Sequence, residues 1–288
     1  MFNPGETSEL HSQEPRVIEA CVKIMQNQGL IGKLVPRSTP QGMASQIYKH
    51  IENQRFDSKT KKSFINNLIK EAKQRLIPLE ELEWIRTNPR ACYLAYGRIF
   101  IFPDESLAGN NNLSSYCLNQ VSRPSNTEER YKNLVIFFDK CTTAINRRLL
   151  ISNLKSEWER VFNERIPFSW LSKSHKEQCD WAWDYISKYY YGPPINYFSV
   201  TSLQEQYLAI YAAYDLWNAP YAEKKLFLQN FTKAWQQKKH RDSRKGKKVC
   251  NLVLSEEVKS KLDIMAEKKN MKLNKFVEML IENEFSKY

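Results

Sequence analysis

The sequence predicts a mainly α-helical fold, built of tandem helical bundles with a single short strand near the C-terminus. Two observations carry this prediction. Glycine is scarce, with 8 residues in 288 where average usage of about 7% would give roughly 20, and this argues against turn-rich all-β folds. Apolar residues also recur at helical spacing through most of the chain. The predicted strand is the β-prone run at 249–254, which begins the last folded unit.

Composition excludes several classes of protein. No GxGxxG or GxxxxGK[ST] motif occurs, so a nucleotide-binding enzyme is not expected. The six cysteines form no CxxC pair and the four histidines are scattered, so we expect no disulfide framework, metal site or cofactor. The start of the chain does not resemble a signal peptide, and no stretch approaches 18 apolar residues. We therefore expect a cytoplasmic protein without membrane insertion, and the net charge of +12 favours an anionic partner.

An internal repeat organises the first 240 residues. Three segments align over twelve positions: KKSFINNLIKEA (61–72), RRLLISNLKSEW (147–158) and KKLFLQNFTKAW (224–235). Each begins with two basic residues and has an asparagine at its seventh position, followed by an apolar residue. We interpret these segments as matching helices of three degenerate units, at about 14–77, 78–166 and 167–240.

Four domains follow from this repeat. They are a first helical unit at 1–77, a second at 78–166, a third at 167–245 that ends in a basic linker, and a last unit at 246–288. The second unit contains a long loop insertion at about 99–130, which opens with a β-prone run from Ile99 to Phe102. A long loop is either functional or simply a connector, and the sequence leaves both open.

Half of the basic surplus lies in residues 201–248, which hold 10 Lys and Arg against 4 Asp and Glu. It is concentrated in the basic cluster, where Asp242 is the single acid. The cluster consists of Lys238, Lys239, Arg241, Arg244, Lys245, Lys247 and Lys248. Considered alone, such a run is equally well a solvated connector. The segment that follows favours phosphate contacts.

The last forty residues predict a strand, a helix, a tight turn and a second helix. The run 249–254 is β-prone, and Ser255 is a good N-cap with two glutamates after it in the first turn. Asn270 ends the first helix because asparagine tolerates the left-handed conformation, and Asn274 is expected to cap the second. Since a unit this small cannot bury a core alone and a lone strand has no partner, the strand should pair with its copy in a second chain.

This order of elements resembles the ribbon-helix-helix family, whose paired strands enter the DNA major groove. Strand alternation then assigns Val249, Asn251 and Val253 to the DNA face, where only Asn251 can hydrogen-bond to a base edge. The start of the second helix, at Asn274 and Lys275, offers backbone N–H groups to a phosphate. The dimer core would consist of Cys250, Leu252, Leu254, Val258, Leu262, Met265, Val277, Leu280 and Ile281.

A wider resemblance covers residues 175–285. A W-x-W-x-Y helix at 181–185, opened by a capping box from Ser174 to Glu177, precedes further helices, a basic helix end and a KK-x-x-x-L strand. Together these are similar to the MatP family, bacterial organisers of the chromosome terminus. The resemblance implies a nucleoid-associated dimer that recognises a short palindrome, with the preceding helical domain gripping the DNA backbone.

The chain departs from the MatP pattern at three places. Asn270 stands where the family has a turn glycine, and Asn274 where it has a cap serine. The family continues into a coiled coil linked to tetramers and bridging, whereas this sequence ends at Tyr288, so the resemblance leaves higher oligomerisation and bridging open.

We therefore predict a non-enzymatic homodimer that binds double-stranded DNA at a specific site, in chromosome organisation or transcription regulation. Adjacent acids such as Asp104-Glu105 are solvated rather than catalytic in this interpretation, and the tyrosines at 189–191 are core and rim rather than a base-stacking platform. One alternative is a transcriptional repressor of a plasmid, a prophage or its own operon. Another is a DNA-addressed adaptor that recruits a protein partner through residues 1–166.

Overall fold

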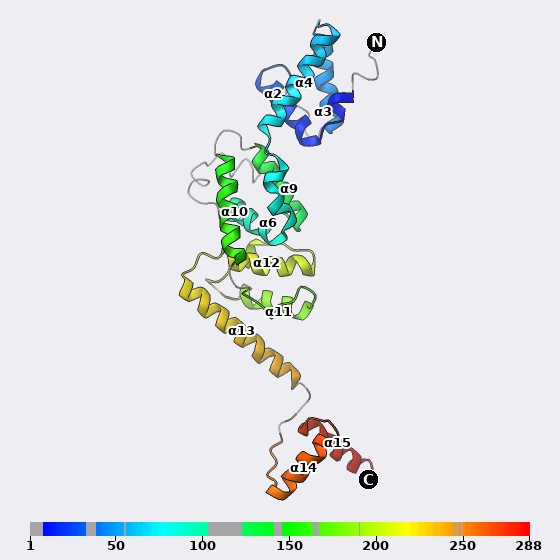
Figure 1. Ribbon diagram of the computed structural model, residues 1–288, viewed down its shortest axis with the longest axis vertical. Helices are drawn as coiled ribbons and strands as arrows, with labels where there is room; N and C mark the ends of the chain where they lie inside the picture. Colours follow the sequence, from blue (N-terminus) through cyan, green and yellow to red (C-terminus); the bar gives the residue numbers. More distant parts are fainter. Residues whose placement is uncertain are drawn as a thin grey trace. The chain divides into compact units, whose positions relative to one another are not determined.

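The computed structural model of the chain is mainly helical, as predicted (Figure 1). The chain divides into two compact units, residues 1–232 and 233–288, and each is described by itself. Among the described residues, no helix combines the length and the apolar character needed to cross a membrane. The structure describes residues 8–32, 39–54, 56–102, 123–140, 146–163, 167–189, 191–244, 246, 248 and 250–288.

The larger unit contains three hydrophobic clusters in chain order. The first is built by α1 (Ser8–His11), α2 (Pro15–Asn27), α3 (Pro40–Asn53) and α4 (Ser58–Arg75). Helix α2 packs against both α3 and α4, and its buried Cys21 and Met25 contribute to this core. The starts of α3 and α4 are capped, since Thr39 accepts a hydrogen bond from the Gly42 N–H and Asp57 accepts one from the Thr60 N–H.

The second cluster contains η1 (Leu79–Leu82), α5 (Glu83–Thr87), α6 (Pro89–Tyr96), η2 (Gly97–Ile101), α9 (Thr127–Lys140) and α10 (Arg147–Asn163). Helix α6 packs against α9 and α10. The β-prone run predicted from Ile99 to Phe102 is wrong, because η2 continues α6 as a π-helical turn and buries Ile99 in the core. The remainder of the insertion up to residue 122 lies outside the described residues.

The third cluster contains α11 (Lys176–Ser187), η3 (Ile195–Tyr197), α12 (Leu203–Leu216) and the first part of α13 (Tyr221–Ser243). Helix α11 packs against α12, and Trp181 stacks on Phe231 of α13 at 5.5 Å between ring centroids. The capping box predicted at Ser174 does not form. The N-cap is His175, which makes no side-chain cap bond, and the Ser174 hydroxyl lies 2.9 Å from that of Ser172 instead.

Helix α6 joins the second and third clusters. Its Cys92 and Ala95 belong to the second core, while Tyr93 belongs to the third, and α6 also packs against α12. This close approach requires a glycine at the start of η2. A Cβ atom on Gly97 would lie 2.1 Å from Cδ1 of the buried Leu216.

The three repeat segments lie on α4, α10 and α13 and bury the same position. Their eighth residues, Leu68, Leu154 and Phe231, are all buried in their respective clusters. Their seventh residues, Asn67, Asn153 and Asn230, are all exposed. The matching pattern of burial gives the three segments the same orientation on their own cores.

Candidate nucleic-acid interface

The basic cluster begins on the last turns of α13. Lys239 and Arg241 are exposed, whereas Lys238 is half-buried and lies 2.5 Å from Asp242, the single acid of this segment. Cations in a last helical turn also stabilise the helix through its dipole, so Arg241 has a structural role besides any contact with phosphate. Arg244 and Lys248 are exposed. Lys245 and Lys247 lie outside the described residues.

The segment predicted to pair as a strand is exposed in the single chain. Cys250, Asn251, Leu252, Val253 and Leu254 have no strand assignment, and the exposed fractions are 101% for Val253, 59% for Leu252 and 38% for Leu254. A strand is defined by hydrogen bonds to a neighbour, and this segment pairs with no other described part of the chain. Val249 lies outside the described residues.

Helices α14 (Glu256–Lys268) and α15 (Leu273–Phe285) form a hairpin. The hydroxyl of Ser255 accepts a hydrogen bond from the Val258 N–H, so Ser255 is the N-cap, as predicted. Asn270 has φ of 50°, and it is the one non-glycine residue with positive φ in the described part of the chain. The left-handed turn predicted at Asn270 is therefore confirmed.

The hairpin has almost no core of its own. Of the described residues from 250 onward, two are buried, Ala266 and Phe276. All nine residues predicted to form a dimer core are exposed or half-buried: Cys250, Leu252, Leu254, Val258, Leu262, Met265, Val277, Leu280 and Ile281. The hairpin therefore leaves most of its apolar side chains in contact with water.

The exposed apolar surface is larger than the sequence predicted. Ile264 on α14 is 50% exposed and Phe285 at the end of α15 is 79% exposed, and neither belongs to the predicted stripes. Ile264 directly precedes Met265, so helical spacing alone assigns it to a neighbouring face. Both residues add to the apolar surface that the hairpin exposes.

The N-cap of α15 lies two residues before the predicted one. Asn274 does not cap this helix, because α15 begins at Leu273 and its N-cap is Lys272, with no side-chain cap bond. Asn274 and Lys275 are exposed in the first turn. The first-turn N–H groups of a helix have no intrahelical partner, and no side chain caps them here, so this end is still suited to an anion.

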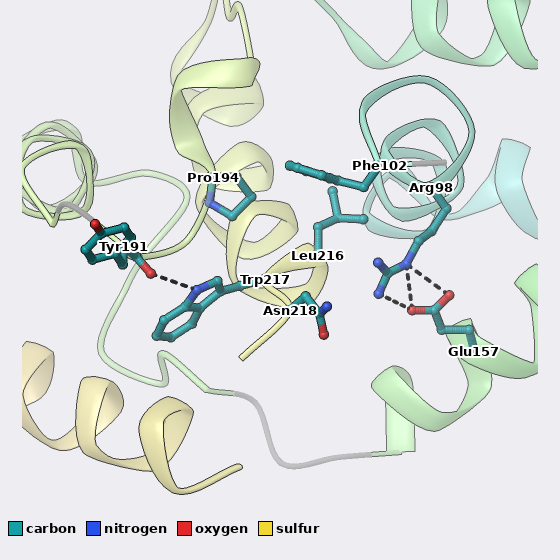
Figure 2. A pocket seen from close by; sticks show the side chains of 9 residues that line it. Arg98, Phe102, Glu157, Tyr191, Pro194, Leu216, Trp217 and Asn218 are labelled. Carbon is teal, nitrogen blue, oxygen red and sulfur yellow. Dashed lines mark hydrogen bonds and ion pairs between the residues drawn. The ribbon is translucent and has the colours of Figure 1, made fainter. Parts of the chain in front are cut away.

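A separate pocket of about 700 Å³ lies in the larger unit (Figure 2). Figure 2 shows Arg98 and Glu157 facing each other across one side, joined at 2.6 Å. On another side the Trp217 indole N–H donates to the Tyr191 carbonyl oxygen. Because the one charged pair on its wall is neutralised internally, the pocket presents no unopposed charge to a ligand.

Among the described residues, the three buried cysteines of the larger unit are unsuited to nucleophilic or metal-binding roles. Burial raises the pKa of the Cys21 and Cys92 thiols to about 12 and that of Cys179 to about 11. These thiols are therefore protonated at neutral pH, whereas nucleophilic or metal-binding cysteines act as thiolates. Within the described ranges, no three His, Cys, Asp or Glu side chains lie close enough together to hold a metal ion.

Comparison with protein-family models, curated proteins and solved structures finds no match for this chain.

Proposed function

We propose that this protein binds double-stranded DNA at a specific site as a homodimer, paired through residues 249–254 in the ribbon-helix-helix manner. One observation carries the proposal: the hairpin α14–α15 buries two residues and exposes an apolar face that adjoins an exposed β-prone segment. A second copy covers this face and supplies the strand partner at the same time. Each half-exposed Leu, Ile, Val or Met buried in this way contributes on the order of 1 kcal/mol.

The basic cluster would supply the phosphate contacts. Two copies in one dimer bring two clusters to one duplex, and the start of α15 adds Asn274 and Lys275 to each. Contacts of this kind position the protein on DNA without reading its sequence.

Asn251 would read the bases by hydrogen bonds. Val249 and Val253 on either side would contact thymine methyl groups. Asparagine suits adenine, since its amide can both donate to and accept from the base edge, and one such pair discriminates by about 1–3 kcal/mol. This is modest for a specific site, so we expect shape-dependent contacts from the basic cluster to contribute as well.

Neutralising the basic cluster should weaken binding to every duplex sequence. In the variant Lys238→Gln, Lys239→Gln, Arg244→Gln, Lys245→Gln, the plot of log K against log salt should flatten by about 0.9 for each phosphate that the protein no longer neutralises. The measurement is a salt titration of duplex affinity by fluorescence anisotropy.

A charge-matched control separates phosphate binding from overall charge. Lys49, Lys132, Lys261 and Lys287 are exposed and lie outside the proposed interface, so their joint replacement by Gln removes the same charge. The control should retain nearly the wild-type slope. An equal change in both variants would place the phosphate contacts elsewhere.

Replacing the reading residue should reduce specificity and leave non-specific binding. For Asn251→Ala we expect the preference for the cognate site over random duplex to fall by roughly 5- to 150-fold, the equivalent of 1–3 kcal/mol. Competition between the two duplexes measures it directly. If discrimination survives the substitution, the assignment of Asn251 to the DNA face is wrong.

The resemblance to the MatP family favours a role in chromosome organisation, and a repressor is the second candidate. The two differ in the number of sites that the protein occupies. Many sites within one chromosomal region would identify an organiser, and one or a few promoter sites would identify a repressor.

A further inference from the structure

Nearly all of the basic surplus lies on three helices. Together α4, α10 and α13 hold 16 Lys and Arg against 5 Asp and Glu, a net of +11, while the whole chain carries +12. These are the helices that bear the three repeat segments. The surplus therefore follows the repeat instead of being spread over the surface.

The helices α10 and α13 also occupy matching places in their clusters. The Arg147 guanidinium donates to the Phe138 carbonyl near the end of α9 at 2.9 Å, and the Lys224 ammonium donates to the Tyr214 carbonyl near the end of α12 at 3.3 Å. In each case the first basic residue of the repeat segment caps the helix that precedes it.

An ion pair recurs in the same register. Arg16 is the second residue of α2 and forms a bidentate ion pair with Asp139. Asp139 directly follows Phe138, whose carbonyl Arg147 caps. Arg90, the second residue of α6, forms the same kind of ion pair with Asp215, the next residue after Tyr214. Both helices begin with proline. The same contacts therefore relate α9 and α10 to α12 and α13, and α2 to α6, while α4 is matched to α10 and α13 by its repeat segment and the burial of its eighth residue.

Helix α4 presents the most basic face of the three. Lys59, Lys62, Asn66, Lys70 and Lys73 follow one another at steps of three or four residues, which places them along one side of the helix, and all five are exposed. On this face there is no acidic residue of α4.

A merely solvated helix face usually alternates its charges. Helix α14 does so, since Lys259 pairs with Asp263 and Lys261 pairs with Glu257 along the helix. The single acid of α4, Glu71, pairs instead with Arg75. Lys62 lies 3.5 Å from Glu9, an exposed pair of little energetic weight. The face of α4 is therefore a row of cations with little neutralisation.

We propose that this face of α4, the lysine row Lys59, Lys62, Lys70 and Lys73, binds the phosphate backbone of duplex DNA. The inference rests on the proposed function: α13, the counterpart of α4, leads into the DNA-reading segment, and α4 repeats its basic character 163 residues earlier. The apolar face of α4 is buried in the first cluster, so the helix lacks the exposed apolar side by which a surface helix enters a membrane.

The consequence is a second, sequence-independent contact beyond the specific site. On a duplex limited to the specific site, about 20 base pairs or two helical turns, the two basic clusters and the starts of α15 would already neutralise most of the available phosphates. A duplex of about 60 base pairs offers further phosphates that the lysine row can neutralise. The added affinity should therefore depend on duplex length and on salt.

The test uses the full chain with Lys59→Gln, Lys62→Gln, Lys70→Gln and Lys73→Gln, against the charge-matched control defined above. On the long duplex the salt slope of the lysine-row variant should flatten by about 0.9 for each phosphate released from the row, up to about 3.6. On the short duplex it should match the wild type. Thermal melting followed by circular dichroism checks that both variants are folded.

Three other outcomes would each overturn one of the claims. Equal slopes for the lysine-row variant and the control on the long duplex would overturn this inference while leaving the proposed function intact. Failure of the wild type to bind either duplex would overturn the proposed function itself. If duplex RNA of the same length displaces the long DNA as well as DNA does, and this competition requires the lysine row, the assignment to DNA is wrong.

Discussion

The double variant Leu280→Asp, Ile281→Asp is expected to be monomeric at concentrations where the wild-type chain is a dimer, and to lose site-specific DNA binding. Leu280 is 39% exposed and Ile281 63% exposed on α15 in the single chain, and both belong to the proposed dimer core. A dimer would bury four unpaired carboxylates there, each at a cost of several kcal/mol. The dissociation constant of the dimer should therefore rise by more than about 10³-fold, as measured by analytical ultracentrifugation.

The matched control adds the same two negative charges at polar positions of the same hairpin. Ser260 on α14 and Asn283 on α15 are exposed and lie outside the predicted apolar stripes. The variant Ser260→Asp, Asn283→Asp should remain dimeric. If the Leu280 and Ile281 variant stays dimeric as well, the dimer is not formed through this face.

The substitution Glu205→Ala is expected to destabilise the larger unit by about 3–5 kcal/mol, because it leaves a buried arginine without its counter-charge. Arg130 is 1% exposed and lies 3.3 Å from Glu205 and 4.0 Å over the ring of Tyr93. Glu205 also accepts hydrogen bonds from the backbone and hydroxyl of Thr127. Urea denaturation of the full chain measures the change in the unfolding free energy.

Two further variants define this effect. Glu205→Gln retains one acceptor oxygen, which can serve Thr127 or Tyr93 but not both, because the two donate to different oxygens of Glu205. It also loses the charge, so its cost should be intermediate. Glu83→Ala removes an exposed ion pair with Arg86 and should change stability by less than about 1 kcal/mol. A cost for Glu205→Ala as small as that for Glu83→Ala would show that Arg130 finds another way to be solvated.

Helix caps and tight turns depend on residues that are close in sequence, so they can be predicted from the sequence. The cap at Ser255 and the left-handed turn at Asn270 are confirmed. The same local rules give the wrong N-cap where another residue, one or two positions away, takes that place. Lys272 precedes α15 in place of Asn274, and His175 precedes α11 in place of Ser174.

Contacts between distant segments cannot be predicted from spacing. Arg130 and Glu205 are 75 residues apart, and Arg90 and Asp215 are 125 apart, so their pairing depends on how the clusters stack. The β-prone run at Ile99 forms a π-helical turn because burial in the second core outweighs its local preference.

The lysine row was not identified from the sequence, for a different reason. Counting charge over residues 1–200 gives a thin surplus of +6, which averages the strongly basic α4 with the acidic helix α11. Counting charge by helix reveals it, since α4 alone carries 6 basic residues and 1 acidic residue.

Selection of duplexes from a randomised pool by the full-length protein tests whether the chain reads a DNA sequence as a dimer. We expect an enriched motif with two-fold symmetry, whose enrichment falls with Asn251→Ala and disappears with Leu280→Asp, Ile281→Asp. A pool that stays random after repeated selection, or a motif that both variants select as well as the wild type does, would contradict sequence-specific binding by this dimer.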